Sequence, residues 1–312
     1  MAARTAASLH VTNGDSVLYL FRKAGITGTH LAWRDALNEG PVPAGLSLEE
    51  TSDVRALYAS ERGYGNPIKI IHDFQRRDAT LRKAETFEEI VLWFEHDLYD
   101  QLQLIQILTT LGEMSLEPGR ISLVQADHYL GTMTADEISP LLARRRTATN
   151  AIFASAKRMW DRFTSPQASE LFVAAQEDSI GLPFLRPALR RLCEEYPSVR
   201  DGLSRSQRQA LEAVAQGLTT PRDLFRSAQA REEASFMGDA AFEKVLADIA
   251  DERAPLIAND DGPWVTTPLG RRVLAGDADW LEAVPPDRWI GGVHVCDGAA
   301  IRWNDDTGKF QT

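Results

Sequence analysis

Acidic and imidazole side chains gather directly after two short apolar runs of this chain. They are Glu95, His96 and Asp97 after Ile90–Phe94, and Asp127 and His128 after Ile121–Val124. Carboxylate oxygens bind hard divalent cations such as Mg²⁺, and imidazole exchanges protons near neutral pH. We expect Glu95 and Asp97 to hold a metal, with Mg²⁺ as the expected ion. His96 or His128 would move protons in a hydrolysis or transfer reaction, and Asp127 would orient the imidazole.

A third polar run, Thr12-Asn13-Gly14-Asp15-Ser16, follows the apolar run Leu9–Val11. A glycine turn that opens a helix presents free backbone N–H groups, and the helix dipole favours an anion there. We therefore expect Thr12, Asn13, Gly14 and Ser16 to bind a phosphate or carboxylate, and Asp15 to join the metal ligands. The run lacks the lysine of a Walker loop and the glycine spacing of a dinucleotide fingerprint.

Arg34 and Asp35 end a fourth apolar run, His30–Trp33. Arg34 supplies the positive charge that an anionic ligand needs. Each of these motifs also has an ordinary structural explanation. Asp15 or Asp97 could cap the helix that follows it, and Arg34 could simply pair with one of the acids.

The order of the elements places these side chains together. Apolar runs alternate with segments of helical pattern, which is typical of a parallel sheet with crossover helices. Right-handed crossovers put all strand ends on one side, and open α/β sheets bind ligands at that carboxyl edge. We therefore predict an α/β fold in which Asn13, Arg34, Glu95, His96 and Asp127 face a common cleft.

Beyond residue 135 the strand pattern fades and helical patterns take over. We expect an α/β ligand-binding domain over residues 1–140, a helical region over 141–200, a winged-helix-like module over 201–284 and a small β tail over 285–312. The module is predicted from three helical segments and a hairpin with an Asp-Gly turn at Asn259–Gly262. Its third helix is acidic, so phosphates would repel it. We favour a protein partner for this module over DNA.

Bulk composition narrows the class of protein. The chain has 312 residues, 44% of them hydrophobic, and a formal net charge of −11, which is typical of a globular protein without a general nucleic-acid surface. Cys193 and Cys296 lie far apart and form no zinc spacing. There is neither a secretory signal pattern nor an apolar stretch of about 18 residues that could span a membrane. We expect a cytoplasmic protein without a membrane partner.

Three segments together resemble the bacterial DUF1835 family, which is named for its lack of an assigned function. They are His10–Ser16, Trp33–Asp35 with Glu39–Pro43, and Trp93–Gln101. The resemblance covers roughly the first 130 residues and implies a shared domain, but it supplies no reaction. Near the C-terminus, Thr266–Leu274 is similar to the helix that follows the wing in many winged-helix proteins.

The combined prediction is an α/β domain that binds a phosphorylated or nucleotide-like small anion, with metal-assisted hydrolysis or group transfer as its chemistry. The alternative is a non-enzymatic ligand sensor or adaptor whose winged helix binds a protein partner.

Overall fold

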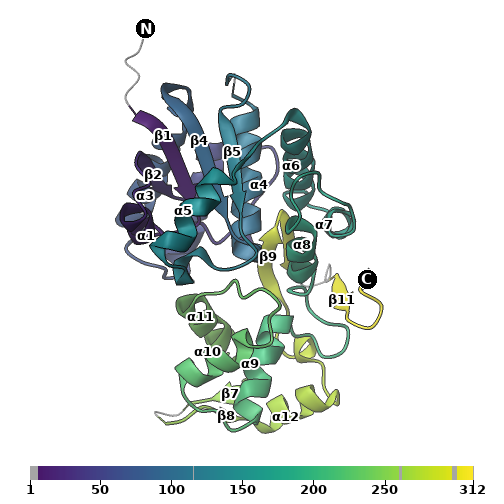
Figure 1. The fold of residues 1–312 in the computed structure, drawn as a ribbon. Helices are drawn as coiled ribbons and strands as arrows, with labels where there is room; N and C mark the ends of the chain where they lie inside the picture. The colour runs from purple at the N-terminus through teal and green to yellow at the C-terminus, as the bar shows by residue number, and fades with distance from the viewer. Residues whose placement is uncertain (1–5, 115, 260–261, 297–300, 312) are drawn as a thin grey trace.

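The structure is a computed structural model that describes residues 6–114, 116–259, 262–296 and 301–311. Its main sheet has the strand order β2-β1-β4-β5-β6, in which the first four strands are parallel and β6 is antiparallel to β5. The strands are β1 (Ala6–Thr12), β2 (Thr29–Ala32), β4 (Phe87–Phe94), β5 (Ile121–Gln125) and β6 (Arg146–Thr147). This arrangement confirms the predicted α/β class and puts the ends of β1, β2, β4 and β5 at one edge (Figure 1).

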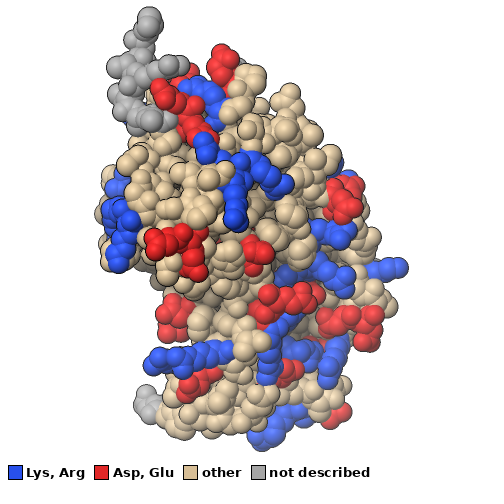
Figure 2. All heavy atoms as spheres, in the orientation of Figure 1, with Lys and Arg blue, Asp and Glu red and all other residues tan. Residues whose placement is uncertain are grey.

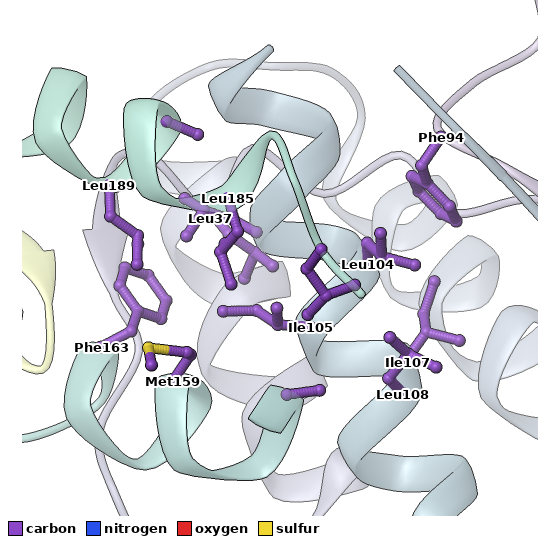
Figure 3. Close-up of a cluster of buried hydrophobic side chains, with 14 of the residues drawn as sticks. Leu37, Phe94, Leu104, Ile105, Ile107, Leu108, Met159, Phe163, Leu185 and Leu189 are labelled. Atoms are coloured by element: carbon purple, nitrogen blue, oxygen red, sulfur yellow. The ribbon is translucent and has the colours of Figure 1, made fainter. Parts of the chain in front are cut away.

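Helices cover both faces of this sheet, which explains why β4 is apolar along most of its length. On one face, α1 (Leu18–Lys23) and α5 (Ala135–Ala143) enclose a small core around Phe21 and Trp93. On the other face lies α4 (Leu98–Gly112), which is packed in turn against α6 (Asn150–Phe163) and α8 (Leu185–Cys193). Figure 3 shows the apolar side chains that meet between α4 and these two helices.

We call the chain outside the C-terminal module described below the α/β half. Its remaining helices pack on the larger of its two cores, the one that contains α4. They are α2 (Leu48–Glu61), α3 (Pro67–Leu81) and α7 (Ala168–Ala174), with short 3₁₀ turns at Ala84–Thr86 and Leu130–Thr132. Side-chain caps fix several helix starts. Ser47 and Glu50 form the capping box expected at the start of α2, and Asn66 caps α3. No helix among the described residues is long and apolar enough to cross a bilayer.

Residues 203–284, called the C-terminal module below, have a hydrophobic core of their own. The module contains α9 (Arg205–Ala215), α10 (Pro221–Gln229), α11 (Asp239–Ile249), the hairpin strands β7 (Ile257–Ala258) and β8 (Val265–Thr266), α12 (Pro268–Ala275) and a 3₁₀ turn at Trp280–Glu282. This order of three helices, a hairpin and a helix is the one expected from the sequence. Asp260 and Asp261 in the expected hairpin turn lie outside the described residues. The winged-helix assignment itself stays a prediction.

The tail after residue 285 returns to the first half of the chain. β9 (Asp287–Gly291) pairs with β10 (Val293–Cys296) and, in parallel, with the two-residue strand β3 (Gly40–Pro41). Where β9 turns into β10, the backbone is packed so tightly on the end of α6 that a Cβ at Gly292 would overlap the Thr164 carbonyl. A separate hairpin of β11 (Arg302–Asn304) and β12 (Lys309–Gln311) follows. The predicted β tail is thus joined to the first domain by backbone pairing.

Candidate metal centre

Three carboxylates meet where β4 passes into α4. Glu95 follows β4 directly, Asp97 is the N-cap of α4, and Asp100 lies in the first turn of that helix. One carboxylate oxygen from each lies within 4.8 Å of the other two. The distance is short because the chain passes from strand to helix without a longer loop, so all three residues share one turn. We call Glu95, Asp97 and Asp100 the acidic cluster.

Backbone and side-chain donors hold the cluster in position. The Asp100 carboxylate accepts the Glu95 N–H at 2.7 Å and the Asn13 Nδ2–H at 2.6 Å. Glu95 Oε1 accepts the N–H of Leu130 at 2.8 Å, and Asp97 Oδ1 accepts the N–H of Asp100 at 3.1 Å. Asn13 and Glu95 follow β1 and β4 directly, Leu130 lies in the turn after β5, and the Asp100 N–H belongs to α4, so the cluster is organised by segments that follow three neighbouring strands.

The acidic cluster is buried without a lysine or arginine partner among the described residues. The three residues are only 6%, 4% and 0% exposed, and no ion pair among the described residues involves any of them. Burial raises the pKa of Glu95 and raises that of Asp100 strongly, with the charges of Asp97 and Glu95 adding to the shift at Asp100. Burial, and then the charge of Glu95, raises the pKa of Asp97 to about 7. Such a cluster is stabilised either by protons or by a bound cation.

Asp35, another buried acid of the chain, has arginine partners. Asp35, at the end of β2, is 2% exposed and accepts the Arg55 Nε–H at 2.9 Å, with Arg77 Nη1 at 3.7 Å from its second oxygen. Arg55 also binds the carbonyl oxygens of Ala36 and Glu39. This fold therefore neutralises Asp35 with arginine, whereas the acidic cluster has no arginine partner within the described ranges.

The acidic cluster lines a pocket of about 370 Å³ between the α/β half and the C-terminal module. Asn13, Tyr99 and Tyr129 belong to the same side of it, and the residues from Ser235 to Gly238 and Ala241 form the opposite wall. No lysine or arginine is among its described lining residues. A second pocket of about 320 Å³ shares Glu39, Phe236 and Met237 with the first, so the two lie next to each other.

Asp15 and Arg34 form an ion pair with each other. Arg34 Nε donates to Asp15 Oδ2 at 2.7 Å, and both side chains are largely exposed. This hydrogen bond, opposed by partial burial, lowers the pKa of Asp15. Arg34 also has a left-handed backbone, with φ of 56°. Asp15, predicted as a metal ligand, is therefore separate from the acidic cluster, and Arg34 does not line its pocket.

The predicted anion loop places one of its residues in the pocket. Asn13 lines it and donates to Asp100, whereas Thr12 Oγ1 donates to the Gly14 carbonyl at 2.7 Å. Ser16 is exposed. The helix that follows, α1, has six residues and no side-chain cap. The loop is thus a tight turn that aims Asn13 at the acidic cluster.

The two predicted proton carriers lie beside the pocket, and neither lines it. The His96 ring is 5.2 Å from the Tyr129 ring, and its buried Nδ1 has no hydrogen-bond partner. Burial lowers the pKa of His96. His128 Nδ1 lies 2.6 Å from Asp127 Oδ1 in an exposed pair, and this hydrogen bond lowers the pKa of Asp127. The predicted orienting contact between Asp127 and an imidazole is therefore present on His128.

Sequence reasoning missed two parts of the site. Asp100 was overlooked, although Asp97 and Asp100 are three positions apart, and this spacing puts two side chains on one side of a helical turn. No sequence pattern predicted that residues 235–238 form the opposite wall, because they lie about 140 residues away from the acidic cluster along the chain.

Comparison with known proteins does not assign this chain to a family. No protein-family model matches the chain and no curated protein is found as a relative. The resemblance to DUF1835 stays a prediction.

Proposed function

We propose that the acidic cluster binds a divalent cation, with Mg²⁺ as the expected ion, and that a phosphorylated or nucleotide-like ligand binds through it in the pocket between the two halves. The reaction that suits this site is hydrolysis or transfer of a phosphoryl-type group. The observation that carries the proposal is the cluster of three buried carboxylates without a lysine or arginine partner among the described residues.

Donor chemistry supports a hard cation. Mg²⁺, Mn²⁺ and Ca²⁺ prefer carboxylate and amide oxygens, and the pocket offers Glu95, Asp97, Asp100 and the Asn13 amide. No cysteine or histidine is among the described lining residues, so the soft and borderline ligands that favour zinc or copper are lacking there. Binding a cation would return all three acids to their ionised form, since an adjacent positive charge lowers a carboxyl pKa.

The same charges decide how an anionic ligand binds. The pocket holds Glu39 besides the acidic cluster and no described basic side chain, so a phosphate alone would be repelled. We therefore expect the cation to bind first and the anion second. This order differs from that of a phosphate site built from arginine or a Walker lysine, where the protein supplies the positive charge itself.

Proton transfer falls to the histidines beside the pocket. A bound cation would polarise a phosphoryl oxygen and lower the pKa of a bound water. Burial lowers the pKa of His96, which favours the neutral ring that can accept a proton. On His128, Asp127 holds Nδ1 and leaves Nε2 to exchange protons. The Tyr129 ring lies 5.2 Å from the His96 ring, tilted by 46°.

Titration with Mn²⁺, followed by electron paramagnetic resonance and calorimetry, tests the proposal. We expect one bound ion in the wild-type protein and a loss of affinity of at least about tenfold in Asp100→Asn, which removes one charged ligand. Glu113→Gln, at the exposed far end of the same helix, is the matched control and should bind normally. Wild-type protein that binds no Mn²⁺ at pH 8 would sink the proposal.

A sensor without catalysis is the second candidate function. The observation that favours it is that the C-terminal module forms one wall of the pocket, so a bound ligand would contact both halves of the chain. Incubation with nucleotides and sugar phosphates in Mg²⁺ separates the two candidates. A ligand that stabilises the protein and is recovered unchanged favours the sensor, and a processed ligand favours the enzyme.

A further inference from the structure

The helical hairpin of α2 and α3 distributes its side chains against the usual pattern. Arg55 of α2 and Arg77 of α3 are buried, with exposures of 2% and 3%. Three apolar side chains are exposed instead, and the exposed fractions of Leu57, Ile68 and Ile71 are 60%, 67% and 41%. Charged side chains are seldom buried, and apolar side chains that gather at the surface mark interaction sites. We call these three apolar residues, together with the groove described next, the hairpin face.

The exposed apolar residues lie at one end of the hairpin, beside a groove. Only residues 62–66 join the two helices, so the end of α2 lies beside the start of α3. A groove of about 300 Å³ lies between the helices, and Ala56, Ile71 and Phe74 form its apolar lining. Polar side chains make up the rest of the lining: Glu49, Ser52, Asp53, Gln75, Asp78 and Arg82. Such a groove can receive one protruding apolar side chain of a partner.

Two opposite charges flank this face without pairing. Asp53 and Lys69 are exposed, and neither belongs to an ion pair formed by the described residues. Asp53 lies eight residues before the end of α2, about 12 Å along the helix, whereas Lys69 lies in the first turn of α3. By contrast, Glu49 and Arg82 pair with each other beside the groove. The face therefore carries one free acid at the groove and one free base next to Ile68, which makes it complementary to itself.

We propose that the hairpin face is a twofold interface between two copies of this chain. A twofold axis between Leu57 and Ile71 places α2 of one copy over α3 of the other. Ile68 of each copy then enters the groove of the other, and Lys69, next to it, meets Asp53 there. Both contacts occur twice, because a twofold interface uses the same patch on each copy. No residue of α2 or α3 is among the described lining of the pocket at the acidic cluster, so this interface does not depend on the cation site.

Sedimentation velocity over a range of protein concentrations tests the apolar part of the interface. We expect the wild-type protein to form a reversible dimer. Ile68→Asp would bury a charge in each groove, so the dissociation constant of the dimer should rise about a hundredfold or more. Ile180→Asp is the matched control, because Ile180 is 56% exposed and lies outside the hairpin. Both replaced side chains are exposed in the single chain, so both variants should fold, which circular dichroism checks.

A charge swap tests the geometry. Asp53→Lys and Lys69→Glu each bring like charges together twice, so each should weaken the dimer about tenfold or more at low salt. An equimolar mixture of these two variants should dimerise like the wild type, because every lysine then meets a carboxylate of the other chain. The double variant, Asp53→Lys with Lys69→Glu, should dimerise like the wild type as well.

Three results would overturn the proposal. Wild-type protein that stays monomeric at about 100 μM has no such interface, and the apolar face is then left to a partner of another kind. A dimer that Ile68→Asp does not weaken is formed through another surface. A mixture of the two charge variants that dimerises no better than each variant by itself excludes the contact between Asp53 and Lys69, and with it the twofold arrangement.

Discussion

The guanidinium of Arg62 donates to both oxygens of the Asp248 carboxylate, from Nη1 at 2.9 Å and from Nη2 at 2.6 Å. Arg62 ends α2, and Asp248 lies on α11, so this bidentate pair joins the α/β half to the C-terminal module. The third helix of a winged-helix protein is the one that normally enters the DNA groove. Here the bidentate pair holds α11 against the α/β half, and the choice between a protein and a DNA partner stays a prediction. Figure 2 shows basic and acidic side chains interspersed on the face that it presents.

A double-mutant cycle measures the strength of this junction. We expect Arg62→Ala and Asp248→Ala to show a coupling of about 0.5–1 kcal/mol in urea unfolding, because both side chains are partly exposed. The coupling should shrink in 1 M salt, where charges are screened within about 3 Å. The exposed pair Asp73 and Arg76, within α3, is the control and should show less. A coupling free energy of zero at low salt would contradict a stabilising role of this pair at the junction.

Stability without divalent cations should fall as pH rises from about 4 to about 7. The pKa of Asp97 is about 7 in the folded protein against 3.8 as its ordinary value, so the folded state binds more protons across this window and loses its advantage as they leave. Mg²⁺ should restore stability most at the upper end, where the acids are ionised. Asp97→Asn, which keeps an N-cap residue, should flatten the dependence. Urea midpoints at pH 5 and 7.5, with and without Mg²⁺, check this, and an unchanged slope in the variant would contradict it.

His10 should remain neutral far below the usual histidine range. It is buried on β1, and the Trp93 Nε1–H donates to its Nδ1 at 3.0 Å. Burial, with a smaller effect of His30, lowers the pKa of His10 to about 4. Because the folded pKa lies below the unfolded value, this residue contributes stability above about pH 6.5 and loses it as pH falls toward 4.

Proton NMR of the imidazole checks the titration of His10. The expected midpoint is near 4, and a midpoint near 6.5 would contradict the buried environment. Trp93→Phe removes the donor that favours the neutral ring, so it should raise the pKa of His10. The same substitution should leave the imidazole resonances of the exposed His72 unchanged.

The glycine between β9 and β10 should tolerate no side chain. A Cβ at Gly292 would overlap the Thr164 carbonyl at the end of α6, so Gly292→Ala should cost about 3 kcal/mol or more, as overpacking does. Gly276→Ala is the control. That position has a left-handed φ of 78° but open space around its Cβ, so the cost should be about 1 kcal/mol. Urea unfolding compares the two, and equal costs would show that the tail is not packed as described.

Local patterns were sufficient to predict most of the α/β half. The parallel strands follow from apolar runs that alternate with capped helices, and the capping box of Ser47 and Glu50 fixed the start of α2. The approach of Asn13 to Glu95 in one pocket follows from the same rule, because β1 and β4 are adjacent and parallel. These features depend on residues close together in the sequence or on the order of the strands, and both can be recognised from sequence patterns.

Long-range packing was not predictable in this way. β3 has two residues and pairs with β9 some 250 positions later, too short a strand to show a periodic pattern. Arg34 and Asp15 were expected at the site, but an exposed arginine beside an exposed aspartate forms a pair at little desolvation cost. The partners of Asp35 are arginines from α2 and α3, whose helical pattern gives no indication of which side chains turn inward.

The pairing of β9 with β3 has a consequence for dividing this protein into pieces. The α/β half is discontinuous in sequence, because a strand from beyond residue 285 completes one of its small sheets. A fragment cut at residue 200 would leave Gly40 and Pro41 without their partner strand and would uncover the end of α6. The C-terminal module, by contrast, is an insertion with both ends anchored to the other half. Replacing residues 203–284 with a short flexible linker would keep β9 paired with β3, although it would take Glu232 from the buried Arg191 and Phe236 from the larger core.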